Sequence, residues 1–213
     1  MEREVRIHTG ELWLPGDLQV PEGAQGLVVF AHWSCSSRLS PRNREVAAAL
    51  RASGRLGTLL FDLLTPEEDR DYERRLDIVL LTVRLWSATR WLLDESPAAG
   101  MPLGYFGAST GAAAALVAAA RKPDTIRAVV SRGGRPDLAG PVLDRVKAPT
   151  LLIVGGDDFP VIEMNREALA GLQVVKKLVI VPGATHLFEE AGSLEQVAAL
   201  ARDWFIKYLP TTI

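Results

Sequence analysis

Six short runs of apolar residues recur along the chain and alternate with longer segments of helical character. The runs cover residues 27–31, 58–61, 103–106, 126–130, 150–154 and 178–181. Most of them are continuously apolar rather than alternating, which is typical of strands when both faces of a parallel sheet are covered. The runs therefore predict the strands of a buried, mostly parallel sheet.

The segments between these runs predict helices. They cover residues 45–53, 76–93, 110–120, 163–172 and 193–209. Gly54 follows the first helix and is expected to end it, and Ser193 with Gln196 predicts a capping box at the start of the last. One stripe of the second helix is apolar and has the spacing of a core-facing surface. It consists of Leu76, Val79, Leu80, Val83 and Trp86.

The N-terminal part has a different pattern. Residues 3–8, 11–14 and 17–20 predict short strands that start the sheet in antiparallel fashion, split by Gly10 and by Pro15-Gly16. Because strands and helices alternate after this start, we expect a doubly wound α/β fold with helices on both faces.

The length sets the domain count. A chain of 213 residues suits one domain, residues 1–213, rather than two. The charged stretch 65–75 predicts a loop within that domain, and no internal repeat or linker divides it.

Composition and charge narrow the function classes. Charged residues make up 23% of the chain, the hydrophobic set 48%, and the formal net charge is −2. This balance gives no electrostatic case for nucleic acid or for an acidic membrane surface. Cys35 is the only cysteine, so a disulfide framework is not predicted. Residues 1–4 are mostly charged and no apolar segment follows them, so we expect no signal peptide and a cytoplasmic protein.

Residues 97–120 carry no charge and are long enough to span a bilayer. Two prolines and four glycines interrupt this stretch, however, and would break a single helix. It therefore predicts a buried strand, a tight turn and a buried helix.

The turn in that stretch is the first candidate for chemistry. Gly107-Ala108-Ser109-Thr110-Gly111 follows a strand and precedes an alanine-rich helix, which is the context of a nucleophile elbow. The flanking glycines leave room for the tight turn. Ser109 would then lie at a helix start, where backbone N–H groups favour a developing oxyanion. The alternative is a phosphate-binding loop, but no lysine follows and Gly-x-Gly-x-x-Gly is absent.

Two later loops, each at a strand end, carry an acid and a base. Residues 155–161 contain Asp157 and Asp158, of which we take Asp158 as the candidate acid; either could instead be a turn or cap residue. Residues 182–188 contain His186, the candidate general base. A lone loop histidine is usually just exposed, but the order serine, aspartate, histidine favours a catalytic role.

These motifs together resemble the α/β-hydrolase superfamily, and more narrowly its dienelactone-hydrolase-like branch. The resemblance rests on residues 40–44, 106–111, 131–137 and 182–190 and covers nearly the whole chain. Some bacterial members of that branch are fused to phosphoribosyltransferase domains. The resemblance implies a Ser109, Asp158 and His186 triad that cleaves a small ester or lactone.

One loop departs from the family pattern. Where the family reads roughly His-Gly-x-Gly-Ser-Ser, residues 32–37 read His-Trp-Ser-Cys-Ser-Ser. Backbone N–H groups of Trp33 and Thr110 are the expected oxyanion hole, although the loss of glycine can forbid a positive φ at position 33. Substrate-binding positions are expected at His32, Cys35, Leu39 and Phe159. The bulky side chains of Trp33, Leu39 and Phe159 suggest a small aromatic or apolar acyl substrate.

Three hypotheses follow from this departure. The chain is a natural hydrolase with a narrowed aromatic pocket, or a scaffold engineered at its active site, or a degenerate hydrolase that is weakly active or only binds. Losing one oxyanion donor costs about 10²–10³ in rate. Cys35 is either a second, designed nucleophile, since thiolates are reactive, or a small residue without a role.

The expected ligands are few. The three histidines lack a zinc spacing and no nucleotide loop is present, so neither a metal nor an organic cofactor is predicted. The expected partner is a small-molecule ester or lactone, with no nucleic acid and no membrane, and the chain is a monomer or a homodimer.

Overall fold

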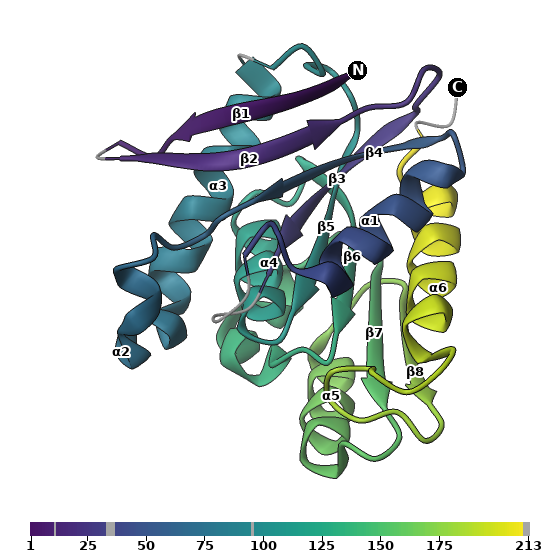
Figure 1. Cartoon of the computed structure of the whole chain (residues 1–213). Coiled ribbons are helices and arrows are strands. Elements are labelled where there is room, and N and C mark those ends of the chain that lie inside the picture. The colour runs from purple at the N-terminus through teal and green to yellow at the C-terminus, as the bar shows by residue number, and fades with distance from the viewer. Residues whose placement is uncertain (11, 33–36, 95, 211–213) are drawn as a thin grey trace.

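A computed structural model describes residues 1–10, 12–32, 37–94 and 96–210, which form an eight-stranded sheet flanked by helices (Figure 1). The strands are β1 (Glu2–His8), β2 (Trp13–Gln19), β3 (Gly26–Ala31), β4 (Leu56–Phe61), β5 (Leu103–Ala108), β6 (Ile126–Arg132), β7 (Thr150–Gly155) and β8 (Lys176–Val181). The α-helices are α1 (Pro41–Ala52), α2 (Tyr72–Leu76), α3 (Ile78–Asp94), α4 (Thr110–Arg121), α5 (Phe159–Gly171) and α6 (Ser193–Tyr208). Two 3-10 helices, η1 (Glu68–Arg70) and η2 (Pro136–Arg145), complete these elements.

The strand order is β1-β2-β4-β3-β5-β6-β7-β8. The β1–β2 and β2–β4 pairs are antiparallel, and every pair from β4 through β3 to β8 is parallel. The predicted doubly wound sheet with an antiparallel start is confirmed. The carboxyl ends of β3, β5, β6, β7 and β8 therefore lie along one edge, where a site of this fold is built.

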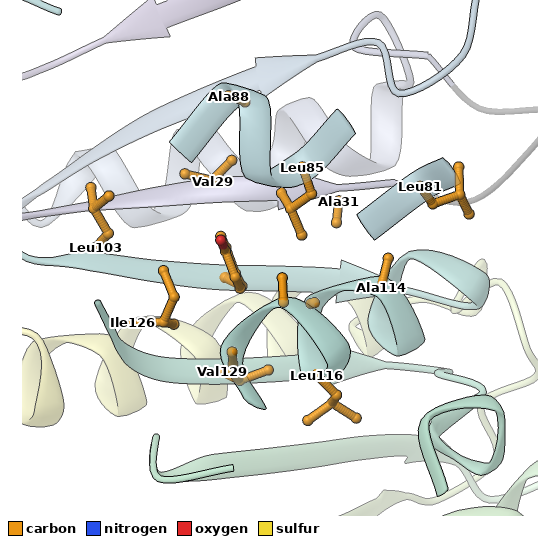
Figure 2. Close-up of a cluster of buried hydrophobic side chains, with 14 of the residues drawn as sticks. Val29, Ala31, Leu81, Leu85, Ala88, Leu103, Ala114, Leu116, Ile126 and Val129 are labelled. Atoms are coloured by element: carbon orange, nitrogen blue, oxygen red, sulfur yellow. The ribbon is translucent and has the colours of Figure 1, made fainter. Parts of the chain in front are cut away.

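Helices cover both faces of the sheet, so each central strand buries both of its sides. On β5, Tyr105 packs into the cluster that includes α3 and α4, whereas Phe106 packs into the cluster that includes α1 and α6. Figure 2 shows the first cluster, with Leu85 of α3 near Val29 of β3 and Leu116 of α4 near Val129 of β6. This two-sided burial explains why the strands read as continuous apolar runs.

The Tyr105 side chain is fully buried and keeps its hydroxyl paired. Its oxygen lies 2.6 Å from Thr89 Oγ1, and burial raises the pKa of the phenol. The hydroxyl of Tyr105 therefore has its hydrogen-bond partner inside the first cluster, away from the strand ends where the site lies.

Two predictions in the N-terminal half are wrong. The proposed break at Pro15-Gly16 does not occur, because β2 runs through it. Proline has no backbone N–H to donate to a neighbouring strand. Pro15 lies just beyond Gly16, where the pairing of β2 with β4 ends, and its carbonyl accepts from Asp62 N. The missing N–H therefore breaks no hydrogen bond between β2 and β4. The stretch 65–75 is not simply a loop, since it contains η1 and most of α2, and Asp71 caps α2 by accepting from Glu73 N at 2.9 Å.

The predicted apolar stripe of the second helix faces the core only in part, through Leu80. Leu76, Val79 and Val83 are 41%, 62% and 46% exposed. Instead a neighbouring stripe is buried, formed by Leu81, Leu85, Ala88 and Leu92. The helix is apolar on more than one side, so periodicity alone could not choose the buried face.

The helix-end predictions gave one success and one error. Gly54 has a φ of +70° directly after α1, as expected of a residue that ends a helix. The capping box at Ser193 is wrong, because Gly192, with a φ of +80°, is the N-cap of α6 and Ser193 lies inside the helix.

Residues 97–120 contain β5 and α4, as predicted, joined by a tight turn. In the described part of the chain, no helix combines the length and the apolar character needed to cross a membrane.

Candidate active site

The turn between β5 and α4 holds Ser109 in a conformation that few side chains adopt. Its φ is +51° and its ψ is −121°, while most non-glycine residues have a negative φ. Such a conformation costs roughly 1–3 kcal/mol and is found mainly where a function requires it. The turn leaves Ser109 partly exposed at the carboxyl edge of the sheet, directly before the first residue of α4.

The two glycines of this turn are required by close backbone contacts. A Cβ on Gly107 would lie 2.4 Å from Ala112 Cα, and a Cβ on Gly111 would lie 2.0 Å from Ala31 O. Both distances are far below van der Waals contact, so no side chain fits. The Gly-x-Ser-x-Gly spacing therefore reflects how tightly the elbow and the end of β3 are packed.

Replacing Gly111 with alanine is expected to destabilise the fold by about 3 kcal/mol or more, since the new Cβ overlaps a backbone carbonyl that cannot move freely. The gain in helix propensity, about 1 kcal/mol, is smaller. Urea denaturation measures the change. Gly140→Ala is the matched control, because a Cβ there meets no atom within 4 Å. A loss below about 1 kcal/mol for Gly111→Ala would contradict the packing argument.

The acid and base loops meet at the adjacent strands. Asp158 Oδ2 lies 2.6 Å from His186 Nδ1, and the side chains are 12% and 35% exposed. The neighbouring Asp157 is exposed and uses its backbone N–H to bond Ala184 O at 3.0 Å. The structure thus places Asp158 rather than Asp157 against the imidazole.

Close packing between the β7 and β8 loops fixes this pair. A Cβ on Gly155 would lie 2.3 Å from Ala184 O, so the two loops touch through backbone alone. The second loop is closed by Glu190, which accepts from Thr185 Oγ1 at 2.6 Å and from Thr185 N at 3.1 Å. The hydrogen bond from the Thr185 side chain is the main cause of a lowered pKa at Glu190.

The segment after β6 brings the serine and the histidine to one place. Ser109 N donates to Arg132 O at 3.3 Å. The next residue, Gly133, has a φ of +50°, and a Cβ on it would lie 3.4 Å from His186 Cε1. One short segment, residues 132–133, therefore touches both the elbow and the imidazole.

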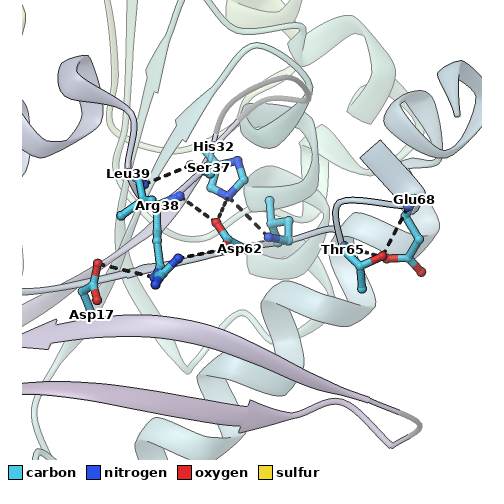
Figure 3. Close-up of polar contacts among 9 residues, drawn as sticks. Asp17, His32, Ser37, Arg38, Leu39, Asp62, Thr65 and Glu68 are labelled. Atoms are coloured by element: carbon cyan, nitrogen blue, oxygen red, sulfur yellow. Dashed lines mark hydrogen bonds and ion pairs between the residues drawn. The ribbon is translucent and has the colours of Figure 1, made fainter. Parts of the chain in front are cut away.

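The candidate oxyanion loop begins at a buried histidine. His32 is 6% exposed, and its Nε2 accepts from Leu63 N at 3.3 Å (Figure 3). The imidazole thus binds the backbone that follows β4. Trp33 and Cys35 lie outside the described residues. The other candidate donor is the backbone N–H of Thr110, the first residue of α4. No carbonyl of the same helix precedes it by one turn, so this N–H group makes no hydrogen bond within α4.

The far end of the same loop is anchored by Asp62, which motif reasoning missed. Asp62 accepts from Arg38 N at 2.7 Å and from Arg38 Nη1 at 3.2 Å, and Arg38 Nε also lies 3.6 Å from Asp17 (Figure 3). These contacts fix Arg38 to the end of β4 and to Asp17 within β2. The sequence signal that could have identified Asp62 is its place directly after the buried strand β4.

Leu39 and Phe159, the other predicted substrate-binding residues, are 50% and 69% exposed. Leu39 follows the anchored Arg38, and Phe159 follows Asp158 at the start of α5. Both therefore flank the site in the chain without packing into the core.

Two further residues near the site were also missed. Asn165 is fully buried and donates to Gly134 O at 3.1 Å, which holds the segment after β6 in place. Arg132 is a buried charge at the end of an apolar strand, and that position was its sequence signal. Within the described residues, no group of three or more His, Cys, Asp or Glu side chains could hold a metal ion.

Comparison with known proteins places this architecture among characterised folds. A dienelactone hydrolase from Anabaena variabilis ATCC 29413 has 57% sequence identity, covers 98% of each chain and superposes with a TM-score of 0.94. Est1E from Butyrivibrio proteoclasticus has only 15% identity but a TM-score of 0.81 over 96% of this chain and 98% of its own, which shows a shared fold.

Curated relatives from Mycobacterium tuberculosis are named "Putative phosphoribosyl transferase". They are 58% identical over 208 residues, which is 98% of this chain but 47% of theirs. The chain thus spans about half the length of these relatives. The model of the Dienelactone hydrolase family matches residues 61–209, more than half of the chain. Together with the Anabaena similarity, this match shows that the chain belongs to the dienelactone hydrolase family.

Proposed function

We propose that this chain is a serine hydrolase that cleaves a small ester or lactone through an acyl-enzyme on Ser109. The observation that supports it best is the 2.6 Å contact between Asp158 and His186, beside a serine held at positive φ. A carboxylate that holds one imidazole nitrogen leaves the other to exchange protons with a nucleophile. Family membership supports a hydrolase of this type.

The proposed reaction has two steps. In the first, Ser109 Oγ attacks the carbonyl carbon while His186 Nε2 takes the hydroxyl proton and passes it to the departing alkoxide. In the second, His186 deprotonates a water molecule, which attacks the acyl carbon; the bond from that carbon to Ser109 Oγ then breaks, and His186 returns the proton to Ser109 Oγ as the acid is released. Asp158 keeps the imidazole oriented and stabilises its charged form in both steps.

The oxyanion of each tetrahedral intermediate is expected to be held by backbone N–H groups of Thr110 and Trp33. The position of Thr110 at the start of α4 supports its part, because both the N–H direction and the helix dipole favour negative charge. The part of Trp33 stays a prediction, as do the hypotheses of an engineered or degenerate loop and of Cys35 as a nucleophile.

The proposed substrate is a small acyl ester or lactone. The exposure of Leu39 and Phe159 supports a place for them at the rim of the site, where an apolar or aromatic acyl group would contact them. His32, bonded to Leu63 N, supports the loop rather than the substrate in this proposal.

The transferase name of the mycobacterial relatives does not enter this proposal. Those proteins extend over about twice the aligned length, and their remaining part can account for the name. We propose that residues 1–213 act as one hydrolase domain, whether alone or within a longer protein.

A fluorophosphonate probe tests the proposal, because it reacts with serines that are activated by a neighbouring base. We expect near-stoichiometric labelling of Ser109, located by peptide mass mapping, and loss of labelling in His186→Ala. Absence of labelling at Ser109 would favour a binding protein instead. If iodoacetamide and the Cys35→Ala substitution each abolish labelling, Cys35 rather than Ser109 is the nucleophile.

A further inference from the structure

A buried cation lies next to the proposed active site and has no partner to neutralise it. Arg132, the last residue of β6, is 4% exposed, and its Nε and Nη1 have no hydrogen-bond partner among the described residues. The equally buried Arg84 differs, since it pairs with Glu68 at 2.9 Å. No described carboxylate comes within ion-pair distance of Arg132, so its charge lacks the compensation that Arg84 has.

An unpaired charge inside a protein is costly, because water no longer solvates it. Burial, and then repulsion from Arg42, lower the pKa of Arg132 to about 10. The group therefore still carries its charge near neutral pH. A structure that keeps such a group at a strand end is one that an anion would stabilise.

The surroundings of Arg132 add further donors, and the carboxylate of Glu189 is bound to Arg42 rather than to Arg132. Arg42 lies in the first turn of α1, and its Nε is also buried without a partner in the described residues. Its Nη1 bonds Glu189 at 2.9 Å, so only part of its donor capacity is used. The N-terminus of α1, a helix of 12 residues without a side-chain cap, adds a positive dipole end.

This cluster adjoins the proposed catalytic residues through the backbone. The carbonyl of Arg132 accepts from Ser109 N, and Gly133 lies under His186. Arg42 and Glu189 connect α1 to the loop that carries His186. A ligand whose charged group sits between Arg132 and Arg42 would thus have its remainder near Ser109.

We propose that Arg132 and Arg42, at the N-terminus of α1, form a subsite for a phosphate group. The three unpaired nitrogens carry four N–H bonds, which already match the roughly four lone-pair sites of a carboxylate, and the N–H groups at the start of α1 add further donors. A phosphate monoester presents three terminal oxygens and up to two negative charges, and guanidinium groups bind it strongly.

Combined with the proposed function, on which this step rests, the subsite assigns the substrate class. It is an ester of a phosphate-bearing compound, whose phosphate is held by Arg132 and Arg42 while its acyl carbonyl reaches Ser109. The subsite itself does not depend on catalysis, so it can be tested separately.

Calorimetric titration of the Ser109→Ala protein with inorganic phosphate, at constant ionic strength in sodium chloride, tests the subsite directly. We expect saturable binding with one site. In Arg132→Met, phosphate affinity is expected to fall roughly tenfold to a hundredfold, the effect of losing charge-assisted hydrogen bonds. Arg127→Met is the matched control, because Arg127 is an exposed arginine of the same strand, at its opposite end.

Thermal unfolding separates a ligand site from a structural arginine. If Arg132 binds an anion, the Arg132→Met protein without phosphate is expected to unfold at the wild-type Tm or above, because the substitution removes an unpaired buried charge. A large drop in Tm would assign Arg132 a structural role and overturn the proposal. Phosphate that raises the wild-type Tm no more than sodium chloride does would also overturn it, without any variant.

Two comparisons identify the source and the chemistry of the anion. Acetate or malonate binding as tightly as phosphate would overturn the phosphate assignment.

Turnover tests the substrate class. We expect kcat/KM on a phosphate-bearing ester to exceed kcat/KM on its neutral analogue, and we expect Arg132→Met to bring the two values together. Phosphate binding without such a ratio would overturn the substrate assignment, and leave free phosphate as the ligand. A wild type that hydrolyses neither ester contradicts the proposed function rather than the subsite.

Discussion

Replacing Ser109 with alanine is expected to lower kcat for ester hydrolysis by about 10⁴-fold or more, because the acyl-enzyme can no longer form. The residual rate would come from binding and from the N–H groups at the start of α4. Steady-state kinetics with a chromogenic ester measures the loss. Folding is expected to be retained, since alanine is smaller than serine and Ser109 makes no side-chain cap bond to α4.

Ser87→Ala is the matched control for this experiment. Its hydroxyl bonds only the preceding helical turn, at Val83 O and 3.1 Å, so kcat should be unchanged. A loss below about tenfold for Ser109→Ala would remove Ser109 as the nucleophile. Full inactivation by Cys35→Ala in the same assay would then identify Cys35 as the nucleophile.

Asp158→Asn is expected to lower kcat by about 10²–10⁴-fold with little effect on KM. An amide at this position still contacts His186 Nδ1 but no longer carries the charge that stabilises the imidazolium, and its NH₂ group favours the wrong tautomer. The structure should stay intact, because the substitution is isosteric.

Asp157→Asn tests the assignment at the neighbouring residue. Asp157 is exposed and contacts the histidine loop through its backbone alone, so its substitution should cost less than about twofold. Equal losses for the two variants would contradict the pairing of Asp158 with His186. A loss confined to Asp157→Asn would move the acid role to that residue.

The central strands were predictable because of where the helices lie. β5 to β7 are covered on both faces, so their apolar runs are continuous and stand out from the rest of the chain. The strand–turn–helix context of Ser109 follows from the same runs. Motif spacing then located the loops of Asp158 and His186 at the ends of neighbouring strands.

Features that depend on lateral contacts were not predictable in this way. The buried face of α3 is decided by its packing on α4 and β1, and its sequence offers a second apolar stripe of similar spacing. β2 continues through Pro15 because its neighbour stops pairing there, which is a property of β4. The roles of Asp62 and Asn165 likewise depend on partners 24 and 31 residues away.

Arg132 shows a third kind of limit. Its place at the end of an apolar strand indicates a buried backbone but contains nothing about a missing counter-ion. Whether a charge is compensated depends on every element packed around it, here α1 and the loop after β8. A sequence pattern contains no such information.

The backbone of Ser109 has an evolutionary consequence. Glycine is the residue that adopts a φ of +51° without strain, so the most stable residue at this position is one that cannot react. Selection for stability and selection for turnover therefore oppose each other at a single codon. In a descendant released from catalysis, we expect this site to drift toward glycine while Gly107 and Gly111 remain, and that combination would mark a lineage that kept the fold after losing the reaction.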